Sequence, residues 1–280
     1  MEYLQKEGFE ITYLPVDHEG KVSLDDLKSA IREDTILVSM MFVNNEIGTI
    51  EPVAEAGQLI KAINKDIVFH VDAVQAYGKV QIRPRAMNID LMSVSSHKIH
   101  GPKGVGFLYI KKGTKIVPIN YGGGQQKGMR SGTENVPGIA GLALAAKLCH
   151  DDFKNRIGKL YELKKYLIDS LNERITDIKI NGPSCEDGAP HIVSLSIRGL
   201  AAETVLNMLS SKKIYVSAGS ACSSNNPHVS DTLVAVGVER ELLESTIRIS
   251  MSVMTTKEEI DFFLDTLCSQ VENMRMFYRH

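Results

Sequence analysis

The chain carries an almost uninterrupted apolar run at Thr35-Ile-Leu-Val-Ser-Met-Met-Phe-Val43. Such a run is typical of a strand that is buried on both faces of a parallel sheet. Further strands are predicted over residues 67–71, 91–95 and 105–110, and an amphipathic helical pattern covers residues 52–65. Strands that alternate with helix-length segments indicate βαβ units, so we predict an α/β fold with a mainly parallel sheet.

A helix is predicted over 134–149, and the pattern changes after about residue 150. The later elements are predicted as helices over 152–174, 201–211 and 257–276 and as strands over 191–197 and 246–251. These two strands alternate polar and apolar residues, which is typical of a sheet with one face in water. We therefore predict a large domain over residues 1–150 and a smaller α+β domain over residues 151–280.

Length and composition are those of an ordinary globular protein. The 280 residues are 43% hydrophobic and 24% charged, with 32 basic and 34 acidic side chains. This balance gives no support to a nucleic-acid or membrane partner, and no apolar run reaches the roughly 18–20 residues of a membrane span. The first residues lack the basic and apolar regions of a signal peptide, and the four cysteines have no C-x-x-C spacing. We therefore expect a reducing, cytoplasmic location.

The first candidate site residue is Lys98, in the segment Ser95-Ser-His-Lys-Ile-His-Gly101 that follows a predicted strand. Ligands of open α/β sheets bind outside the carboxyl ends of the strands. A lysine there can form a Schiff base with an aldehyde, although a lone loop lysine is more often simply solvated. His97 and His100 have H-x-x-H spacing without a nearby carboxylate, which is a weak metal signal, so no metal is predicted.

Asp72 stands at the end of another predicted strand, and Gln75 follows one turn later. A carboxylate at this edge of a sheet can pair with a bound cation. The alternative is that Asp72 caps a helix, because aspartate is a favoured N-cap residue.

The Gly-rich segment 121–133 is predicted to be a loop. Its backbone N–H groups can cradle an anion, and Arg130, Ser131 and Thr133 favour that interpretation. It lacks the Walker A pattern, and a flexible linker is the alternative.

Cys222 lies among small polar residues, in surroundings that allow a thiolate to react. Cys149 and Cys268 fall in helical patterns and are predicted to be core residues, whereas Cys185 falls in a turn. Arg248 occupies a polar position of an alternating strand, where a guanidinium can clamp a carboxylate bidentately. A solvated strand face is the alternative for Arg248.

Six motifs occur in a fixed order along the chain. They are Asn44-Asn-Glu-Ile-Gly48, His70-Val-Asp-Ala-Val-Gln75, Ser95-Ser-His-Lys98, Met129-Arg-Ser-Gly-Thr-Glu-Asn135, Ser217-Ala-Gly-Ser-Ala-Cys-Ser223 and Thr246-Ile-Arg-Ile-Ser250. Together they closely resemble the NifS/IscS-type cysteine desulfurases, in the class V aminotransferase branch of fold-type I pyridoxal phosphate enzymes. The resemblance runs from about residue 1 to about residue 275, and it implies an aspartate aminotransferase-like transferase fold.

The resemblance also implies how the cofactor, pyridoxal 5'-phosphate, is held. Lys98 looks like the lysine that bonds the cofactor covalently and then moves protons. Asp72 would bind the pyridine N–H, and Gln75 the phenolic oxygen. Ser95 and His97 would bind the phosphate, and His97 is counted with the catalytic residues as well.

The remaining residues of the resemblance concern the substrate and the partners. Thr133 matches a residue that reaches the phosphate of the other subunit, which implies a homodimer. Asn45 and Arg248 would hold the carboxylate of L-cysteine. Cys222 matches the thiol that takes the sulfur, leaving L-alanine and a persulfide that supplies iron–sulfur cluster or thio-cofactor assembly. A long segment after Cys222 resembles the catalytic loop that delivers sulfur to an acceptor or scaffold protein.

The chain departs from the family at its start. Family members carry a further N-terminal block with a phosphate-binding loop and a histidine that stacks on the cofactor, and His18 does not match that histidine. We therefore expect an N-terminally truncated large domain, as in a fragment, a shortened gene product or a split enzyme whose N-terminal half is supplied in trans. The alternative functions are a non-catalytic subunit of such an enzyme and a selenocysteine lyase.

Overall fold

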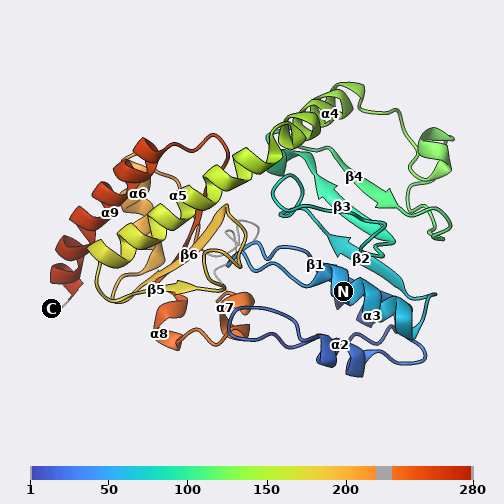
Figure 1. The fold of residues 1–280 in the computed structure, drawn as a ribbon, viewed down its shortest axis with the longest axis horizontal. Coiled ribbons are helices and arrows are strands. Elements are labelled where there is room, and N and C mark those ends of the chain that lie inside the picture. The colour runs from blue at the N-terminus through green and yellow to red at the C-terminus, as the bar shows by residue number, and fades with distance from the viewer. Residues whose placement is uncertain (1, 219–228, 279–280) are drawn as a thin grey trace. The chain divides into compact units, whose positions relative to one another are not determined.

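A computed structural model describes residues 2–218 and 229–278 (Figure 1). By its contacts the chain divides into two compact units. Residues 36–43 and 53–158 form the first, called the four-stranded unit below. Residues 1–35, 44–52 and 159–280 form the second, called the three-stranded unit.

The four-stranded unit is built on the sheet β1-β2-β3-β4. Its strands are β1 (Leu37–Met41), β2 (Val68–Asp72), β3 (Leu91–Ser95) and β4 (Gly106–Ile110). The first three strands are parallel, and β4 runs antiparallel to β3. The predicted strands and the mainly parallel sheet are therefore confirmed.

The helices of this unit are α3 (Val53–Ile63), the 3₁₀ helices η1 (Ser96–Ile99) and η2 (Gln125–Gly128), α4 (Val136–His150) and the first residues of α5 (Phe153–Arg174). Helix α3 connects β1 to β2 and buries Val53, Ala56 and Ile60. Within β2 and β3, the residues on one face are buried and those on the other face are half-buried. The polar side chains of these strands lie on the half-buried face.

Strand β1 is less buried than its apolar sequence predicts. Leu37 is 38% exposed, and Ile36 just before the strand is 62% exposed. The expectation of burial on both faces is wrong for β1 because it is an outer strand that pairs with β2 alone in the described sheet.

The three-stranded unit holds the antiparallel sheet β5-β6-β7. Its strands are β5 (Ile178–Asn181), β6 (Ile192–Ile197) and β7 (Thr246–Ser250). Its helices are α1 (Glu2–Lys6), α2 (Leu24–Ala30), most of α5, α6 (Ala202–Ser211), α7 (Asp231–Ala235), α8 (Arg240–Leu243) and α9 (Lys257–Tyr278).

The central strand β6 has no wet face. All six of its residues are buried, so the expectation from its alternating sequence is wrong there. The polar members bond inside the protein instead: the Asn181 amide donates to Ser196 Oγ over 2.8 Å, and Ser196 Oγ lies 2.6 Å from Thr246 Oγ1. Alternation predicts which side chains share a face but not whether water reaches that face.

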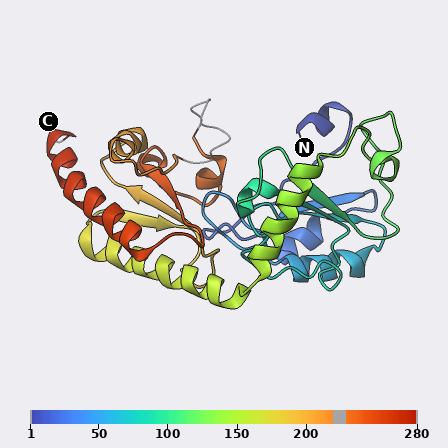
Figure 2. The same cartoon turned by 90° about the horizontal axis from the view of Figure 1, so that it is seen from above.

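The long helices α5 and α9 lie side by side in the three-stranded unit (Figure 2). The Tyr166 hydroxyl donates to the Asp261 carboxylate over 2.5 Å, and Arg174 pairs with Asp265 over 2.7 Å. Their inner faces bury Leu167 and Leu264. None of the described helices is long and apolar enough to cross a membrane.

Along the chain, contacts change from one unit to the other after Gly158, within α5. Residues 1–35 and 44–52 group by contacts with the later part of the chain. The division into a large domain over residues 1–150 and a smaller one over residues 151–280 stays a prediction.

Candidate active site

The carboxyl edge of the four-stranded sheet gathers several predicted site residues. Asp72 ends β2 and Ser95 ends β3. The two strands are parallel, with Asp72 paired in register with Ser93. Both strand ends therefore lie at the same edge, which is where open α/β sheets bind ligands.

Asp72 begins a tight turn. Its Oδ1 accepts the Val74 N–H over 2.9 Å, which is an Asx turn rather than a cap on an α-helix. Among the described residues no other hydrogen bond reaches this carboxylate. Gln75 lies in the same turn and is buried, with 8% of its surface exposed. The turn thus orients a half-buried carboxylate that keeps capacity to accept further bonds.

The segment after β3 places Lys98 in the short helix η1. Ser95 Oγ lies 2.7 Å from His97 Nδ1, so the two polar groups form one pair. Lys98 is half-buried, and no hydrogen bond from a described residue reaches its ammonium. This amine is thus held at the ligand-binding edge without a carboxylate partner in the described chain.

The backbone of η1 is held in place by packing against α4 and by a close contact within its own segment. Ile99 is buried in a cluster with Leu142 and Ala145 of α4. A Cβ on Gly101 would lie 2.1 Å from Ser96 Oγ, so the close approach of these two residues requires glycine. Packing therefore fixes the helix that carries Lys98.

His70 links three strands of the same sheet. Its Nδ1 lies 2.8 Å from Ser39 Oγ on β1, and its Nε2 lies 2.9 Å from Ser93 Oγ on β3. Burial lowers the pKa of His70, and the Asp72 carboxylate only partly opposes this effect. No role for His70 is predicted from the sequence, although its two-residue spacing from Asp72 already places both side chains on one face of the strand.

The Gly-rich segment 121–133 is a loop apart from η2, as predicted. The Ser131 hydroxyl donates to the Gly123 carbonyl over 2.8 Å, and Arg130 donates to the Ser131 carbonyl over 3.1 Å. Thr133 is exposed. Within the described residues, no hydrogen bond joins Thr133 to the groups around Lys98.

Asn45 and Arg248 come together in the three-stranded unit. Arg248 Nη1 donates to the Asn45 carbonyl over 2.9 Å, Nε donates to Ser250 Oγ over 3.2 Å, and Nη2 donates to Ser217 Oγ over 3.4 Å. Ser217 also pairs with Arg248 through the backbone. The guanidinium is half-buried and held from several sides, so the solvated alternative does not describe it.

Cys222 lies outside the described residues. Cys149, Cys185 and Cys268 are free thiols and half-buried, and burial raises the pKa of each. The described residues form no cluster of three or more metal-ligating side chains.

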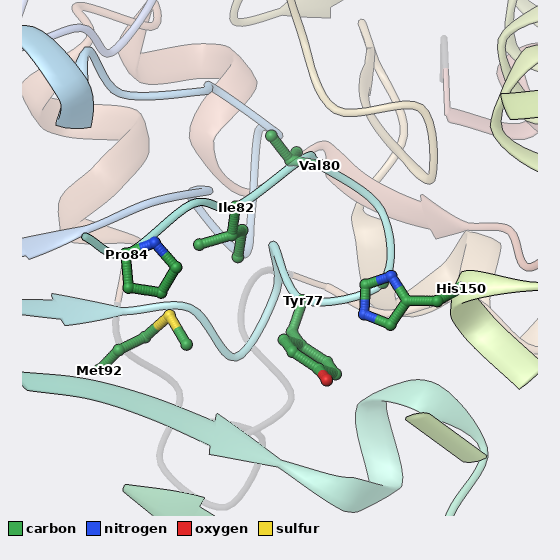
Figure 3. A pocket seen from close by; sticks show the side chains of 7 residues that line it. Tyr77, Val80, Ile82, Pro84, Met92 and His150 are labelled. Atoms are coloured by element: carbon green, nitrogen blue, oxygen red, sulfur yellow. The ribbon is translucent and has the colours of Figure 1, made fainter. Parts of the chain in front are cut away.

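A cavity of about 240 Å³ lies beside the Asp72 turn but contains none of the predicted site residues (Figure 3). Its side chains come from Tyr77, Val80, Ile82, Pro84, Met92 and His150. The Tyr77 ring stands edge-on to His150, with 5.4 Å between the ring centroids. The lining is mostly apolar, so this cavity is distinct from the polar strand edge.

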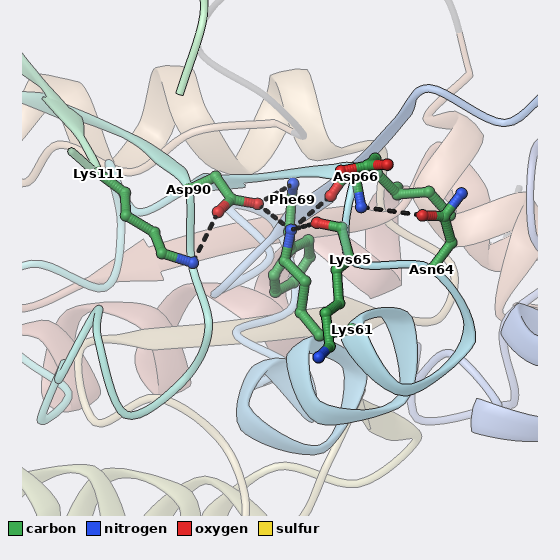
Figure 4. Close-up of polar contacts among 8 residues, drawn as sticks. Lys61, Asn64, Lys65, Asp66, Phe69, Asp90 and Lys111 are labelled. Atoms are coloured by element: carbon green, nitrogen blue, oxygen red, sulfur yellow. Dashed lines mark hydrogen bonds and ion pairs between the residues drawn. The ribbon is translucent and has the colours of Figure 1, made fainter. Parts of the chain in front are cut away.

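The opposite, amino edge of the sheet holds a different group of charges (Figure 4). Asp90 accepts Lys61 Nζ over 2.5 Å, the Phe69 N–H over 2.8 Å and Lys111 Nζ over 3.1 Å. The Asp90 side chain is 7% exposed. Burial acts to raise the Asp90 pKa, but these hydrogen bonds outweigh it and the pKa lies below its ordinary value.

Comparison with known proteins identifies the class. The model of the family described as aminotransferase class-V matches residues 1–263, and the chain belongs to that family. A solved NifS-like protein superposes with a TM-score of 0.90 at 39% identity, over 97% of this chain and 71% of that protein. The fold is thus that of the fold-type I pyridoxal phosphate-dependent transferases, as predicted.

Within this family, the chain is similar to individual cysteine desulfurases. The chain is 46% identical over 275 residues to the cysteine desulfurase IscS of Clostridium botulinum (strain Hall). That match covers 98% of the chain and 69% of the relative. The cysteine desulfurase IscS of Methanosarcina thermophila is 44% identical over 273 residues, covering 98% of the chain and 67% of that protein. The chain therefore spans about two thirds of these relatives.

Proposed function

We propose that this chain is a pyridoxal phosphate-dependent cysteine desulfurase that converts L-cysteine to L-alanine and takes the sulfur on Cys222. The observation that carries the proposal is the placement of Asp72, Ser95 and Lys98 at one carboxyl edge of a parallel sheet. The similarity to IscS proteins over 98% of the chain supports the same conclusion.

The residues present fit pyridoxal phosphate. The Ser95–His97 pair offers hydroxyl and imidazole donors to a phosphate. The Asp72 carboxylate has capacity to pair with a protonated ring nitrogen, and the Lys98 amine can condense with an aldehyde. When bound, the cofactor supplies an electron sink for the carbanion chemistry.

The chain's own groups have distinct tasks in this proposal. Lys98 would hold the cofactor through its aldehyde and would move protons at its amine. Asp72 would favour the protonated ring nitrogen, because a neighbouring carboxylate stabilises the charged form. Gln75 would offer its amide N–H to the phenolic oxygen.

Asn45 and Arg248 would bind the substrate carboxylate. A guanidinium presents a planar fork that matches a carboxylate. Its bonds to the Asn45 carbonyl and to Ser250 Oγ hold that fork in one orientation before substrate arrives. Less side-chain entropy is then lost on binding.

Cys222 would complete the reaction. Its thiolate attacks the sulfur of the bound cysteine, so that an S–S bond forms and the C–S bond breaks. The electron pair of the broken bond stays with the three-carbon skeleton, which takes up a proton and leaves as alanine. An acceptor or scaffold protein would then receive the sulfur from the persulfide.

A homodimer is part of the proposal. The segments before and after Thr133 in the four-stranded unit expose large apolar side chains, a kind of side chain that marks protein contacts when several gather in a patch. They are Val117, Ile119, Tyr121, Val136, Ile139, Leu144 and Leu148. A second copy of the chain would cover them and bring its cofactor phosphate to Thr133. The cytoplasmic location stays a prediction from the cysteine pattern.

The test begins with the visible absorption spectrum of the purified chain after pyridoxal phosphate is added. We expect a band that is missing in Lys98→Ala, and sulfide release from L-cysteine with dithiothreitol that is missing in Cys222→Ala. Selenide release from L-selenocysteine that survives Cys222→Ala, and that exceeds sulfide release from L-cysteine, would favour a selenocysteine lyase. Absence of the band in a folded chain would contradict the proposal and favour a non-catalytic subunit.

A further inference from the structure

A second lysine, Lys79, contacts the backbone of the segment that carries Lys98. Lys79 is half-buried, and its Nζ donates to the backbone carbonyl of Lys98 over 2.8 Å. An ammonium withdrawn from water costs free energy unless it is compensated. No carboxylate of the described residues forms an ion pair with Lys79.

The surroundings of Lys79 are tight. The pKa of Lys79 is lowered to about 8, chiefly by burial and to a smaller extent by the Lys98 ammonium, while the Cys149 thiol acts in the opposite direction. The titratable groups facing it are thus Lys98 from η1 and Cys149 from α4, with Tyr77 in its own turn. A Cβ on the adjacent Gly78 would lie 3.0 Å from Cys149 Sγ and 3.3 Å from Ile99 Cγ2. The two backbone segments are therefore packed against each other.

The carbonyl that Lys79 binds lies at the end of η1. The last carbonyls of a helix have no amide partner within the helix. At this end, His100 adopts a left-handed conformation with φ of 65°, and its N–H and that of Gly101 both bond to the Ser96 carbonyl. The Lys98 carbonyl takes no part in that closure, and a cation is the favoured partner for it.

The other end of the contact starts in the Asp72 turn. The Ala73 carbonyl accepts the N–H groups of Ala76 and Tyr77, and the Ala76 carbonyl accepts those of Lys79 and Val80. Together with the bond from the Val74 N–H to Asp72, these bonds form a series of consecutive turns from Asp72 to Lys79. The Lys79 side chain therefore joins the turn of Asp72 and Gln75 to the segment of Lys98.

We propose that Lys79 is a positioning residue that fixes the main chain of Lys98 against the turn carrying Asp72 and Gln75. The inference rests on the proposed function, because it assigns these three side chains to one cofactor. It goes beyond that function in giving the cofactor site a support that touches neither cofactor nor substrate. The support sets the place of the lysine before any cofactor binds.

The chain offers a matched control in its other unit. Lys164 is 3% exposed, burial lowers its pKa, and its Nζ donates to the Ala189 carbonyl over 2.9 Å. The Ala189 N–H in turn bonds to the Gly48 carbonyl. Lys79→Met and Lys164→Met thus remove the same kind of bond at two sites, so a general effect of losing a buried lysine should appear in both variants.

Hydrogen exchange followed by mass spectrometry, on the full chain without pyridoxal phosphate, separates the two effects. In Lys79→Met we expect the amides of His100 and Gly101 to exchange at least tenfold faster, while the Ala189 amide is unchanged. In Lys164→Met we expect the reverse. This readout does not depend on cofactor binding, so it remains decisive if the proposed function fails.

A second readout is the dissociation constant of pyridoxal phosphate, followed by the visible band. We expect it to rise tenfold or more in Lys79→Met and to stay within twofold in Lys164→Met. Lys79→Arg, which keeps a donor, should recover part of the loss. If Lys79→Met does not fold, Lys79→Leu, which also lacks a donor, takes its place in both readouts. Unchanged exchange at His100 and Gly101 in a folded variant that lacks the donor would overturn the proposal.

Discussion

The aspartates at the two edges of the four-stranded sheet differ in how many hydrogen bonds they accept. At the amino edge, Asp90 accepts three hydrogen bonds, two of them from lysines (Figure 4). At the carboxyl edge, Asp72 accepts one bond, from the Val74 N–H, among the described residues. Asp72 and Lys98 at this edge do not form an ion pair with each other.

The difference distinguishes an aspartate that stabilises the fold from one that can bind a ligand. A buried charge whose partners are all supplied by the chain stabilises the fold and has nothing left to offer a ligand. A charge held in place with unused bonding capacity costs stability unless a ligand completes it. We therefore expect substitutions at the carboxyl edge to lower activity and substitutions at the amino edge to lower the free energy of unfolding.

The largest effect is expected at the carboxyl edge. Asp72→Asn keeps an oxygen for the Val74 N–H, so we expect the free energy of unfolding to change by less than about 1 kcal/mol. Loss of the charge should lower kcat/KM for L-cysteine by about 10³-fold, because a fixed electrostatic partner is removed. Kinetics and urea unfolding of one preparation check this. An active Asp72→Asn would remove the distinction between the edges.

The next effect is expected at the amino edge. Asp90→Asn leaves Lys61, whose side chain is 14% exposed, without its counter-charge. We expect a loss of about 3 kcal/mol in the free energy of unfolding. Pyridoxal phosphate should bind the folded fraction as in the wild type. Because the folded pKa of Asp90 is lowered, the wild type should lose this stabilisation as the pH falls below about 4. Acid titrations that coincide for both proteins would count against the ion pairs.

A smaller, pH-dependent effect is expected from Lys79. Its pKa is about 8 in the folded chain against an ordinary value of 10.5. The unfolded chain therefore binds more protons between these values, and stability should rise with pH across this window by at most about 3 kcal/mol. The difference between the wild type and Lys79→Met in urea unfolding at pH 7.5, 9 and 10 measures it. A difference that does not vary with pH would mean that Lys79 is not desolvated.

The smallest effect is expected inside the sheet. Ser39→Ala removes one hydrogen bond to His70 and should cost about 1 kcal/mol of unfolding free energy. Ser93→Ala should cost a similar amount from the other side of the ring. Because the folded pKa of His70 is lowered, the wild type should lose stability as the pH falls below about 6.5. His70→Gln should flatten that dependence, and identical acid profiles would exclude His70 as its source.

Much of this arrangement was predictable from the sequence. Strand ends at Asp72 and Ser95 follow from apolar runs that stop at polar residues, and the order of the motifs identified the family. Lys79 was not predictable, because its role depends on a carbonyl 19 residues further along the chain. The burial of β6 was not predictable either. Its alternating polar residues predict a face in contact with water, but hydrogen bonds among Asn181, Ser196 and Thr246 satisfy these polar groups inside the protein.

Strand β1 has a consequence for how the sheet can grow. In the described chain it pairs with β2 only, and Ile36 and Leu37 at its start are exposed. An outer strand offers a row of N–H and C=O groups to any further strand. A segment added there in parallel would extend the sheet on the side away from β4 and would lengthen the same carboxyl edge at which Asp72 and Ser95 end. The sheet is thus a template whose ligand-binding edge widens with each parallel strand it gains.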